Sequence, residues 1–244
     1  QCAIYGECSI TGPGRHFFVG GMSSSAMFSG ISFIGATESA VVVASPLKSA
    51  FCHCVFNSNV KEDGKQGASI YARASTDIVV QYCTFENNNA LKGSCITSVG
   101  RLEVSHCNFI ENEGASIYMR LDSYAVVSDS NFSGNILLDR DSDGVAITAI
   151  DNFDLQISNN AFVNNEGRMI SIDDAVSNKF SFVDYGGNIG SISNDCQIYR
   201  QGSESCSRFV TPEPVTILTT PPTSNPIASS TPGPTTSPTT ASPT

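Results

Sequence analysis

Six times in this chain, a Phe or Tyr is followed three residues later by an Asn. Successive aromatic positions lie 23 to 30 residues apart, and Phe33 begins the series without the Asn. The pairs are Phe56/Asn59, Phe85/Asn88, Phe109/Asn112, Phe132/Asn135, Phe162/Asn165 and Tyr185/Asn188. A period of this length is typical of solenoids, in which each repeat buries its apolar face only against its neighbours. The spacing therefore predicts stacked coils.

Each repeat contains three short segments in which apolar residues alternate with polar or small ones. One contains a β-branched residue such as Ile70, a second contains a pair such as Ile78 and Val80, and the third contains the aromatic residue. Alternation of period two indicates strands with one buried face, and no segment has a clear 3.6-residue period. The sequence therefore predicts an all-β protein with three short strands in each coil.

This pattern resembles the right-handed parallel β-helix of the pectate-lyase-like and pectin-lyase-like families over roughly residues 15–190. The resemblance implies about seven coils of about 23 residues. It also implies that the turn asparagines stack into a ladder of side-chain amides, and Asn tolerates the left-handed conformation of tight turns. The predicted ladder is Asn59, Asn88, Asn112, Asn135, Asn165 and Asn188.

The composition divides the chain into four parts. Residues 1–14 and 191–210 are expected to be cysteine-containing caps of the β-helix, residues 15–190. Residues 211–244 hold 11 Thr, 9 Pro and 5 Ser, so they cannot bury a core and favour extended polyproline II. This tail resembles those of mucins and hydroxyproline-rich wall glycoproteins. The predicted O-glycosylation sites are Thr216, Thr219, Thr220, Thr223, Ser229, Ser230, Thr231, Thr235, Thr236, Ser237, Thr239, Thr240 and Ser242.

Charge and cysteine content restrict the compartment and the partners. The net charge of −10 argues against nucleic-acid binding, which needs clustered Lys and Arg. No apolar run approaches the roughly 20 residues that a membrane-spanning helix requires. The first residue is Gln, which suggests a mature chain after removal of a signal peptide. Nine cysteines in an acidic β-rich chain indicate an oxidising, extracellular setting.

Cysteines near both ends are expected to form disulfides that hold the caps. Cys196 and Cys206 flank a polar loop after the last coil, and Cys2 and Cys8 are expected to act similarly at the other end, with Cys52 as a further candidate partner.

The remaining cysteines lie within the repeats. Cys54, Cys83 and Cys107 each precede an aromatic residue by two positions, so they should stack in adjacent coils, either as buried thiols or with one strained bridge. Cys95 neighbours Ile96 and is expected to point outward, paired either locally or with another molecule.

Two sequence motifs predict a modification and a metal site. Asn131-Phe132-Ser133 is an N-glycosylation sequon in which Asn131 should face away from the core. The segment 139–144 places Asp139, Asp141 and Asp143 before a Gly, as in the opening of a calcium-binding loop. The Glu expected at the twelfth position is missing, so the alternative is an acidic solvated loop. Calcium is the only cofactor that the sequence suggests.

A further group of residues predicts carbohydrate binding. Tyr71, Arg73, Tyr118 and Arg120 are expected on one outward strand face, where stacking and bidentate contacts suit an acidic sugar. The alternative is a surface ladder without a ligand. Extra residues near 60–66, 89–92 and 136–142 should emerge from one edge of the coils, where function or lateral contact is expected.

These features predict an extracellular structural glycoprotein, a repeating subunit of a surface fibril, appendage or wall. Open coil ends favour head-to-tail self-association, with the tail contacting a neighbouring subunit. One alternative is a carbohydrate-binding or adhesive module on a stalk. The other is a polysaccharide-degrading enzyme. The three-Asp, His and Arg-x-Lys constellation of the family's hydrolases is missing, and we expect no catalysis.

Overall fold

The structure is a computed structural model that describes residues 8–61, 66–138, 144–151, 153–173, 180–190, 197–200 and 205–209. The chain divides into two compact units, Gln1–Pro212 and Glu213–Thr244. All described residues belong to the first unit, so the predicted tail with its O-glycosylation sites lies outside them. No helix in the described residues is long and apolar enough to cross a membrane.

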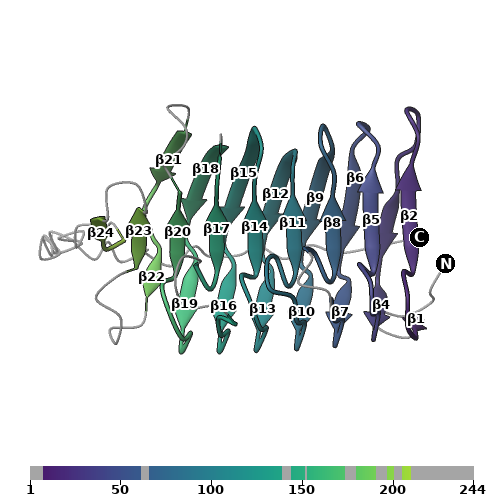
Figure 1. The fold of residues 1–244 in the computed structure, drawn as a ribbon, viewed down its shortest axis with the longest axis horizontal. Helices are drawn as coiled ribbons and strands as arrows, with labels where there is room; N and C mark the ends of the chain where they lie inside the picture. The colour runs from purple at the N-terminus through teal and green to yellow at the C-terminus, as the bar shows by residue number, and fades with distance from the viewer. Residues whose placement is uncertain are drawn as a thin grey trace, which may run out of the picture. The chain divides into compact units, whose positions relative to one another are not determined.

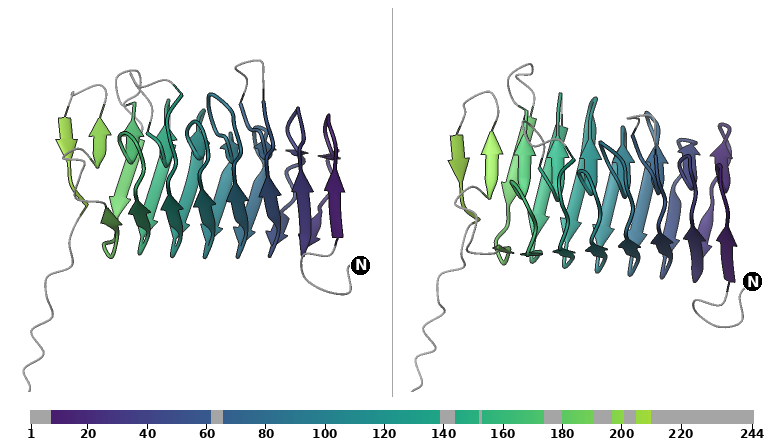
Figure 2. Two further views of the ribbon diagram at one scale, coloured as in Figure 1. Left: turned by 90° about the horizontal axis from the view of Figure 1, so that it is seen from below. Right: turned by 60° about the horizontal axis from the view of Figure 1, so that its bottom comes forward.

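The first unit is a right-handed parallel β-helix whose described strands form three sheets (Figures 1 and 2). Sheet A contains β1 (Cys8–Thr11), β4 (Ile31–Ile34), β7 (Val55–Asn57), β10 (Thr84–Glu86), β13 (Asn108–Ile110), β16 (Asn131–Ser133), β19 (Ala161–Val163) and β22 (Ile189–Gly190). Sheet B contains β2 (Phe17–Gly20), β5 (Val41–Ala44), β8 (Ile70–Ala72), β11 (Ile96–Ser98), β14 (Ile117–Met119), β17 (Ile147–Ala149), β20 (Ile170–Ile172), β23 (Ile198–Arg200) and β24 (Ser205–Ser207). Sheet C contains β3 (Met27–Ser29), β6 (Ser49–Cys52), β9 (Asp77–Gln81), β12 (Arg101–Ser105), β15 (Ser123–Ser128), β18 (Phe153–Ser158) and β21 (Phe180–Asp184).

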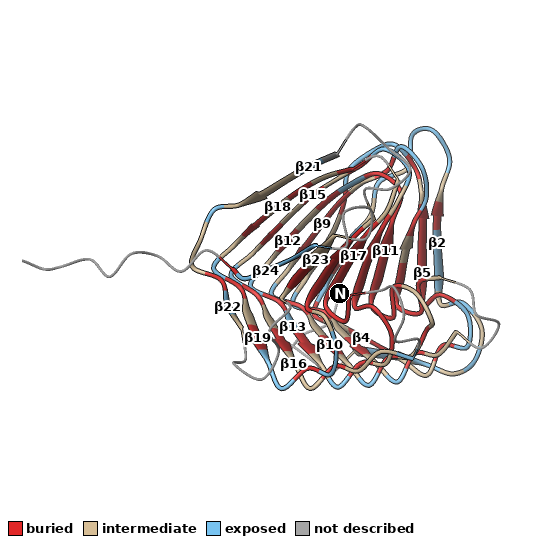
Figure 3. Ribbon diagram, turned by 60° about the vertical axis from the view of Figure 1, so that its left-hand side comes forward, coloured by how far each residue is buried: buried red, intermediate tan, exposed pale blue. Residues whose placement is uncertain are grey.

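Each coil passes through the sheets in the order A, B, C, and every pairing between described coils is parallel except that of β23 with β24. The corner between sheets C and A is turned by one residue in the left-handed conformation, for example Tyr82 with φ 54°. The predicted three strands per coil are therefore confirmed. Figure 3 shows the consequence, a buried interior enclosed by the three sheets.

The predicted aromatic positions form a stack through the core. The rings of Phe33, Phe56, Phe85, Phe109, Phe132 and Phe162 lie one above another. Neighbouring ring centroids are between 4.5 Å and 5.1 Å apart. All six side chains are fully buried. Each buried Phe contributes about 1.5–3 kcal/mol through the hydrophobic effect, and this repeated contact stabilises the helix.

The turn asparagines form the predicted ladder from Asn59 to Asn165. The Nδ2 of Asn88 donates to Oδ1 of Asn112 at 3.0 Å and to the carbonyl of Phe56 at 2.9 Å. Equivalent bonds link Asn59 to Asn88, Asn112 to Asn135 and Asn135 to Asn165. These bonds explain the fixed Phe-x-x-Asn offset, because each Asn side-chain amide donates a hydrogen bond to the carbonyl of the Phe in the preceding coil.

A second ladder, which the sequence did not predict, runs along the corner before sheet A. The backbone N–H of Cys54 donates to Sγ of Cys83, that of Cys107 to Oγ of Ser130, and that of Ser130 to Oδ1 of Asn160. The three stacked cysteines are buried free thiols, which decides between the two alternatives left open by their spacing. Their sulfur atoms take the role that hydroxyl and amide groups play in later coils.

The last coil departs from the predicted repeat. Asn188 bonds to Asn160 in the second ladder and not to Asn165, and Tyr185 is 67% exposed. The register aligns Gly190, not Tyr185, with Phe162. The assignment of Tyr185 and Asn188 to the first ladder is therefore wrong. Their spacing matches the repeat by chance, but the two residues lie at the corner between sheets C and A, one corner before the position of the first ladder.

Cys95 is fully buried and free, so the prediction that it points outward is wrong. It lies at the corner before β11, where the inward–outward alternation of a strand does not apply, and burial raises the pKa of its thiol. Cys8 and Cys206 each take part in a disulfide bond. Cys2 and Cys196, which the sequence predicts as their partners, lie outside the described residues. The pairings therefore remain predictions, and Cys52 is free.

Candidate anion-binding site

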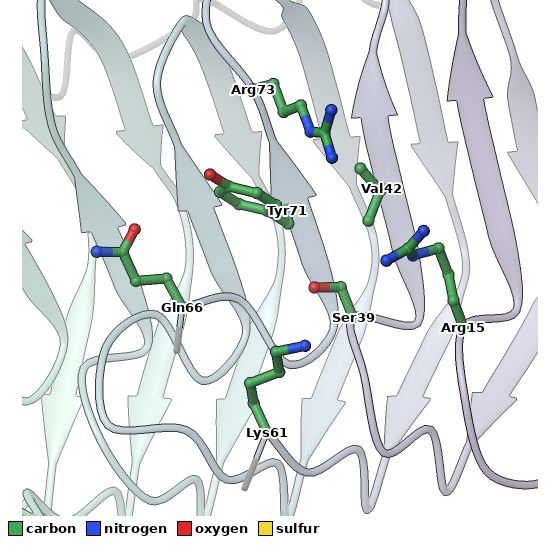
Figure 4. A pocket seen from close by; sticks show the side chains of 7 residues that line it. All are labelled: Arg15, Ser39, Val42, Lys61, Gln66, Tyr71 and Arg73. Atoms are coloured by element: carbon green, nitrogen blue, oxygen red, sulfur yellow. The ribbon is translucent and has the colours of Figure 1, made fainter. Parts of the chain in front are cut away.

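A pocket of about 430 Å³ lies on the outer face of sheet B, over β5 and β8. Pockets that bind small ligands are typically of this size. The lining side chains are those of Arg15, Ser39, Val42, Lys61, Gln66, Tyr71 and Arg73 (Figure 4). The strands position two of these side chains directly, since Val42 and Tyr71 are register partners on β5 and β8 and point outward.

Three cationic groups converge on the pocket. Figure 4 shows the guanidinium groups of Arg15 and Arg73 and the amine of Lys61 directed toward the space over Ser39 and Val42. Among the residues that the structure describes, the lining includes no Asp or Glu. This concentration of positive charge is unusual for a chain with 13 basic and 23 acidic residues. Its chemistry favours an anionic ligand.

Only one of the three cations has a carboxylate partner among the described residues. Arg15 Nη2 donates to Glu38 Oε2 at 2.8 Å. The guanidinium of Arg73 instead lies 5.7 Å from the ring centroid of Phe18, a cation–π contact that leaves its N–H donors available. Lys61 and Arg73 are therefore the groups best placed to bind an anion.

The floor of the site is partly aromatic. Val42 and Tyr71 line the pocket from equivalent outward positions on β5 and β8, and Phe18 holds the same register position on β2 without lining the pocket. Tyr71 is half-buried, and it can offer both a ring face and a hydroxyl group. Cations around an apolar floor suit a ligand that has an apolar face and an acidic edge, such as an acidic sugar.

The predicted carbohydrate-binding group is only partly assembled. Tyr71 and Arg73 line the pocket together, and Nη1 of Arg120 reaches Oε1 of Gln66 on its rim at 3.4 Å. Tyr118 is 1% exposed, and the Lys92 amine lies 5.4 Å from its ring centroid. Tyr118 therefore cannot serve as an open stacking surface.

Arg15, Lys61 and Gln66 were not predicted as site residues. Lys61 and Gln66 lie at the two ends of the predicted insertion 60–66. Isolated bridges stack Val60 on Asn89, and Gln66 on Lys92, along the edge between sheets A and B. The concentration of insertions along this edge was therefore the sequence feature that could have indicated Lys61 and Gln66. Arg15 has only a weak signal, since its partner Glu38 is 23 residues away, one repeat.

A second pocket, between sheets B and C, differs in its electrostatics. Its lining includes Arg101, Asp77 and Tyr124. Arg101 Nη2 donates to Glu103 Oε1 at 2.5 Å and its Nε is 4.0 Å from Asp77 Oδ1. The hydrogen bond from Arg101 lowers the pKa of the Glu103 carboxyl. Because this cation is already neutralised, the second pocket is the poorer anion site.

The other predicted site residues are not brought to the pocket. Asn131 lies half-buried on β16 with an outward register position, while the inward Phe132 is fully buried. N-glycosylation of Asn131 remains a prediction. Asp139, Asp141 and Asp143 lie outside the described residues, which contain no cluster of three potential metal ligands.

Comparison with known proteins agrees with this architecture. Residues 52–202, well over half of the chain, match the family described as the right handed beta helix region. No curated protein and no solved structure matches the chain. The family match and the three stacked parallel sheets agree, and the chain belongs to the right-handed β-helix family.

Proposed function

We propose that this protein is an extracellular β-helix glycoprotein that binds an acidic saccharide in the pocket over β5 and β8. The observation that carries the proposal is the convergence of Arg15, Lys61 and Arg73 on a pocket whose described lining residues include no Asp or Glu. Lys61 and Arg73 supply charge and hydrogen-bond donors for a carboxylate or sulfate, and Tyr71 supplies a surface for a sugar ring. The Thr/Pro-rich tail and the sequon at Asn131 support the extracellular setting.

Binding without cleavage is the simpler function for this arrangement. The lining residues that the structure describes offer cations, a hydroxyl group, an amide and a phenol, but no carboxylic acid and no imidazole. Hydrolysis of a glycosidic bond commonly uses two carboxyl groups flanking the bond. A lyase reaction, with Lys61 or Arg73 as the base, is the enzymatic alternative to test.

The test is titration of the full chain with a uronic-acid oligosaccharide and with its neutral, methyl-esterified form. We expect the acidic form to bind more tightly, with an affinity that falls as salt rises because the contacts are ionic. Arg73→Gln and Lys61→Gln should each weaken binding about tenfold, the effect of losing a charge-assisted hydrogen bond. Arg101→Gln is the matched control, since it removes the same charge from a different sheet.

Two results would contradict the proposal. Equal affinity for the acidic and neutral forms would show that the cations do not recognise the ligand. Equal weakening by Arg73→Gln and Arg101→Gln would indicate a general charge effect and not this pocket. If the oligosaccharide is instead cleaved and the products carry unsaturated sugar ends, the protein is a lyase and not only a binding protein.

A repeating subunit of a surface fibril is the second candidate. The observation in its favour is the open strand edge at the first coil, where β1, β2 and β3 each have one described neighbour. Electron microscopy of native material tests it, since regular fibres support the subunit and monodisperse particles exclude it.

A further inference from the structure

Three free cysteines form a column at the corner between sheets C and A. Cys54, Cys83 and Cys107 are buried, and each lies two residues before one of the stacked Phe residues. They directly precede β7, β10 and β13, which are neighbours in sheet A. The three thiols therefore occupy the same position in consecutive coils.

The sulfur atoms are placed alike in the three coils. Each thiol lies within hydrogen-bond distance of the carbonyl two residues before it, at 3.5 Å in Cys54 and 3.3 Å in Cys83 and Cys107. The ring centroids of the Phe residues two positions later are 4.8 Å and 4.9 Å apart, which is the usual spacing of paired strands. Neighbouring sulfur atoms are therefore about 4.8 Å apart.

This spacing is too wide for a disulfide and matches a metal ion held between two sulfur atoms. A disulfide needs Cβ atoms about 3.5–4.5 Å apart, closer than equivalent side chains in stacked coils. A bond between a metal ion and a thiolate is about 2.3 Å long, so an ion in line between two sulfur atoms needs them about 4.6 Å apart. The column provides this distance without movement of the backbone.

The arrangement selects a soft ion with two ligands. The sulfur atoms lie in a row and not around one point, and the described residues contain no cluster of three potential metal ligands. Structural zinc sites are almost always four-coordinate, so the column does not suit zinc. Thiolates also select Cu(I), a soft ion. Cu(I) is therefore the ion that fits.

The hydrogen-bond ladder at this corner does not by itself explain three sulfur atoms in succession. In the next two coils the same position holds Ser130 and Asn160, and their side chains accept the equivalent backbone N–H bonds. A hydroxyl or an amide therefore serves the fold as well as a thiol does. The three cysteines add a property that Ser and Asn lack, which is affinity for soft metal ions.

The surroundings stabilise negative charge on sulfur, the form that binds metal. The backbone N–H of Cys54 donates to Sγ of Cys83 at 3.4 Å. Hydrogen bonding to the Cys83 thiol lowers the pKa of Cys54 and of Cys107. The hydrogen bonds to Cys107 and Cys54 raise the pKa of Cys83, so an ion must displace its proton, and the affinity should rise with pH.

Cys52 connects the column with the surface. It is half-buried at the end of β6, two residues before Cys54. Burial raises the pKa of its thiol, and the charges of Cys54 and Cys107 raise it further, so this thiol lies within electrostatic range of the column. A partly exposed sulfur beside buried ones gives a soft ion a path inward.

We propose that Cys54, Cys83 and Cys107 form a buried Cu(I) site, in which the ion lies between Cys83 and one of its two neighbours. Binding replaces the protons of two thiols, which pass to solvent, and no electron is transferred. Cys83 belongs to both possible pairs, so it is the essential ligand. The proposal is independent of the saccharide pocket, whose lining contains no cysteine among the described residues.

Anaerobic titration of the full chain with Cu(I), supplied as its bicinchoninate complex, tests this proposal. The chelator keeps the ion from weak surface sites. We expect one Cu(I) for each chain and an absorption band in the near ultraviolet from charge transfer between thiolate and copper. The melting temperature should rise, because the ion binds the folded chain in preference to the unfolded one.

Single substitutions separate the three ligands. Cys83→Ser should abolish binding, because it leaves two sulfur atoms about 9.6 Å apart, twice the coil spacing. Cys54→Ser and Cys107→Ser should each still bind one ion through the remaining pair, whereas the double variant should bind none. The hydroxyl can keep the hydrogen bonds of the ladder, as that of Ser130 does, so these variants should fold.

Two controls use cysteines outside the column. Cys95→Ser removes another buried thiol and should leave binding unchanged. Cys52→Ser should slow the uptake of Cu(I) without changing the amount bound.

Three results would overturn the proposal. A wild-type chain that takes no Cu(I) from the chelator is the first. The second is a folded Cys83→Ser variant that binds as much as wild type; if that variant does not fold, the double Cys54→Ser/Cys107→Ser variant decides in the same way. The third is loss of the bound ion in Cys95→Ser or Cys52→Ser, which would place the ion outside the column.

Discussion

The ring of Phe209 stacks on the ring of Phe162, with centroids 4.8 Å apart and ring planes inclined by 21°. In earlier coils, the ring above each Phe comes from the next strand of sheet A. In the last coil the register places Gly190 there, and Gly190 has no side chain. Phe209, which follows β24, fills this position. The residue that ends the core therefore comes from beyond the last coil.

Replacing Phe209 by Ala should lower the free energy of unfolding by about 3–5 kcal/mol, the usual cost of truncating a buried Phe. The side chain is 6% exposed, and its loss opens the end of the core beside Phe162. Denaturant unfolding followed by circular dichroism measures the change.

Tyr185→Ala is the control for this substitution. Tyr185 has the sequence spacing of a stack residue but is 67% exposed, so its loss should change the stability by no more than about 0.5 kcal/mol. If Tyr185→Ala destabilises the protein as much as Phe209→Ala, the assignment of the last stack position is incorrect.

The contrast between Phe209 and Tyr185 shows which parts of the aromatic stack the sequence spacing can predict. The stack from Phe33 to Phe162 was predictable because each coil repeats the contacts of the coil before it. The end of a repeat has no next coil, so its core must be closed by residues outside the period. Spacing alone cannot identify such a residue, and here it indicated Tyr185, whose side chain is exposed.

Asn112→Ala should destabilise the protein by at least about 3 kcal/mol, because four hydrogen bonds to buried groups are lost, including the one from its Nδ2 to Oδ1 of Asn135 at 3.0 Å. Oδ1 of Asn112 accepts from the backbone N–H and from Nδ2 of Asn88, at 2.9 Å and 3.0 Å, and its own Nδ2 donates to the carbonyl of Phe85. Each unsatisfied buried group costs about 1–3 kcal/mol. Thermal and denaturant unfolding measure the loss.

Asn108→Ala provides a comparison within the same coil. Asn108 is exposed on β13, so the same chemical change should have little effect there. Equal effects of the two substitutions would mean that the ladder adds nothing beyond ordinary turn formation.

The candidate site was less predictable than the ladder. Tyr71 and Arg73 follow the strand pattern, so their outward placement could be read from the sequence. Lys61 and Gln66 lie in an insertion, whose path depends on the coils against which it packs. Tyr118 has the same pattern as Tyr71, yet it is buried, because the segment that carries Lys92 lies over it. Periodicity gives the direction of a side chain but not what covers it.

Glu103→Gln should lower the melting temperature slightly at neutral pH and have no effect in acid. The hydrogen bond from Arg101 lowers the pKa of Glu103 in the folded chain. A carboxyl with a lowered folded pKa stabilises the protein above its unfolded pKa, and this stabilisation is lost as the pH falls through the folded pKa. The effect should be small because the side chain is one-third exposed.

A series of melting curves from neutral to acidic pH tests this expectation. Glu111→Gln is the control, since Glu111 is exposed and has no ion pair among the described residues. A difference between wild type and Glu103→Gln that grows on acidification would reverse the expected sign.

Among the five free cysteines that the structure describes, thiol labelling of the folded protein should modify only Cys52. Cys52 is half-buried, whereas the other four free cysteines in the described part of the chain are buried. Burial also raises the pKa of Cys52, so its reaction should be slow at neutral pH and accelerate as the thiolate forms in alkali. Mass spectrometry after labelling identifies the site, and unfolding should expose all five. Modification of Cys95 in the folded protein would contradict its burial.

Cys83→Ser should be tolerated, whereas Cys83→Val should cost about 1–3 kcal/mol. The Cys83 thiol donates to the carbonyl of Phe51 at 3.4 Å and accepts the backbone N–H of Cys54 at 3.4 Å. A serine hydroxyl can do both, as Ser130 shows two coils later, where it accepts the N–H of Cys107. Valine fills a similar volume but provides neither a donor nor an acceptor. Equal stability of the two variants would mean that the sulfur only fills space. A less stable Ser variant would mean that apolar packing outweighs the hydrogen bonds.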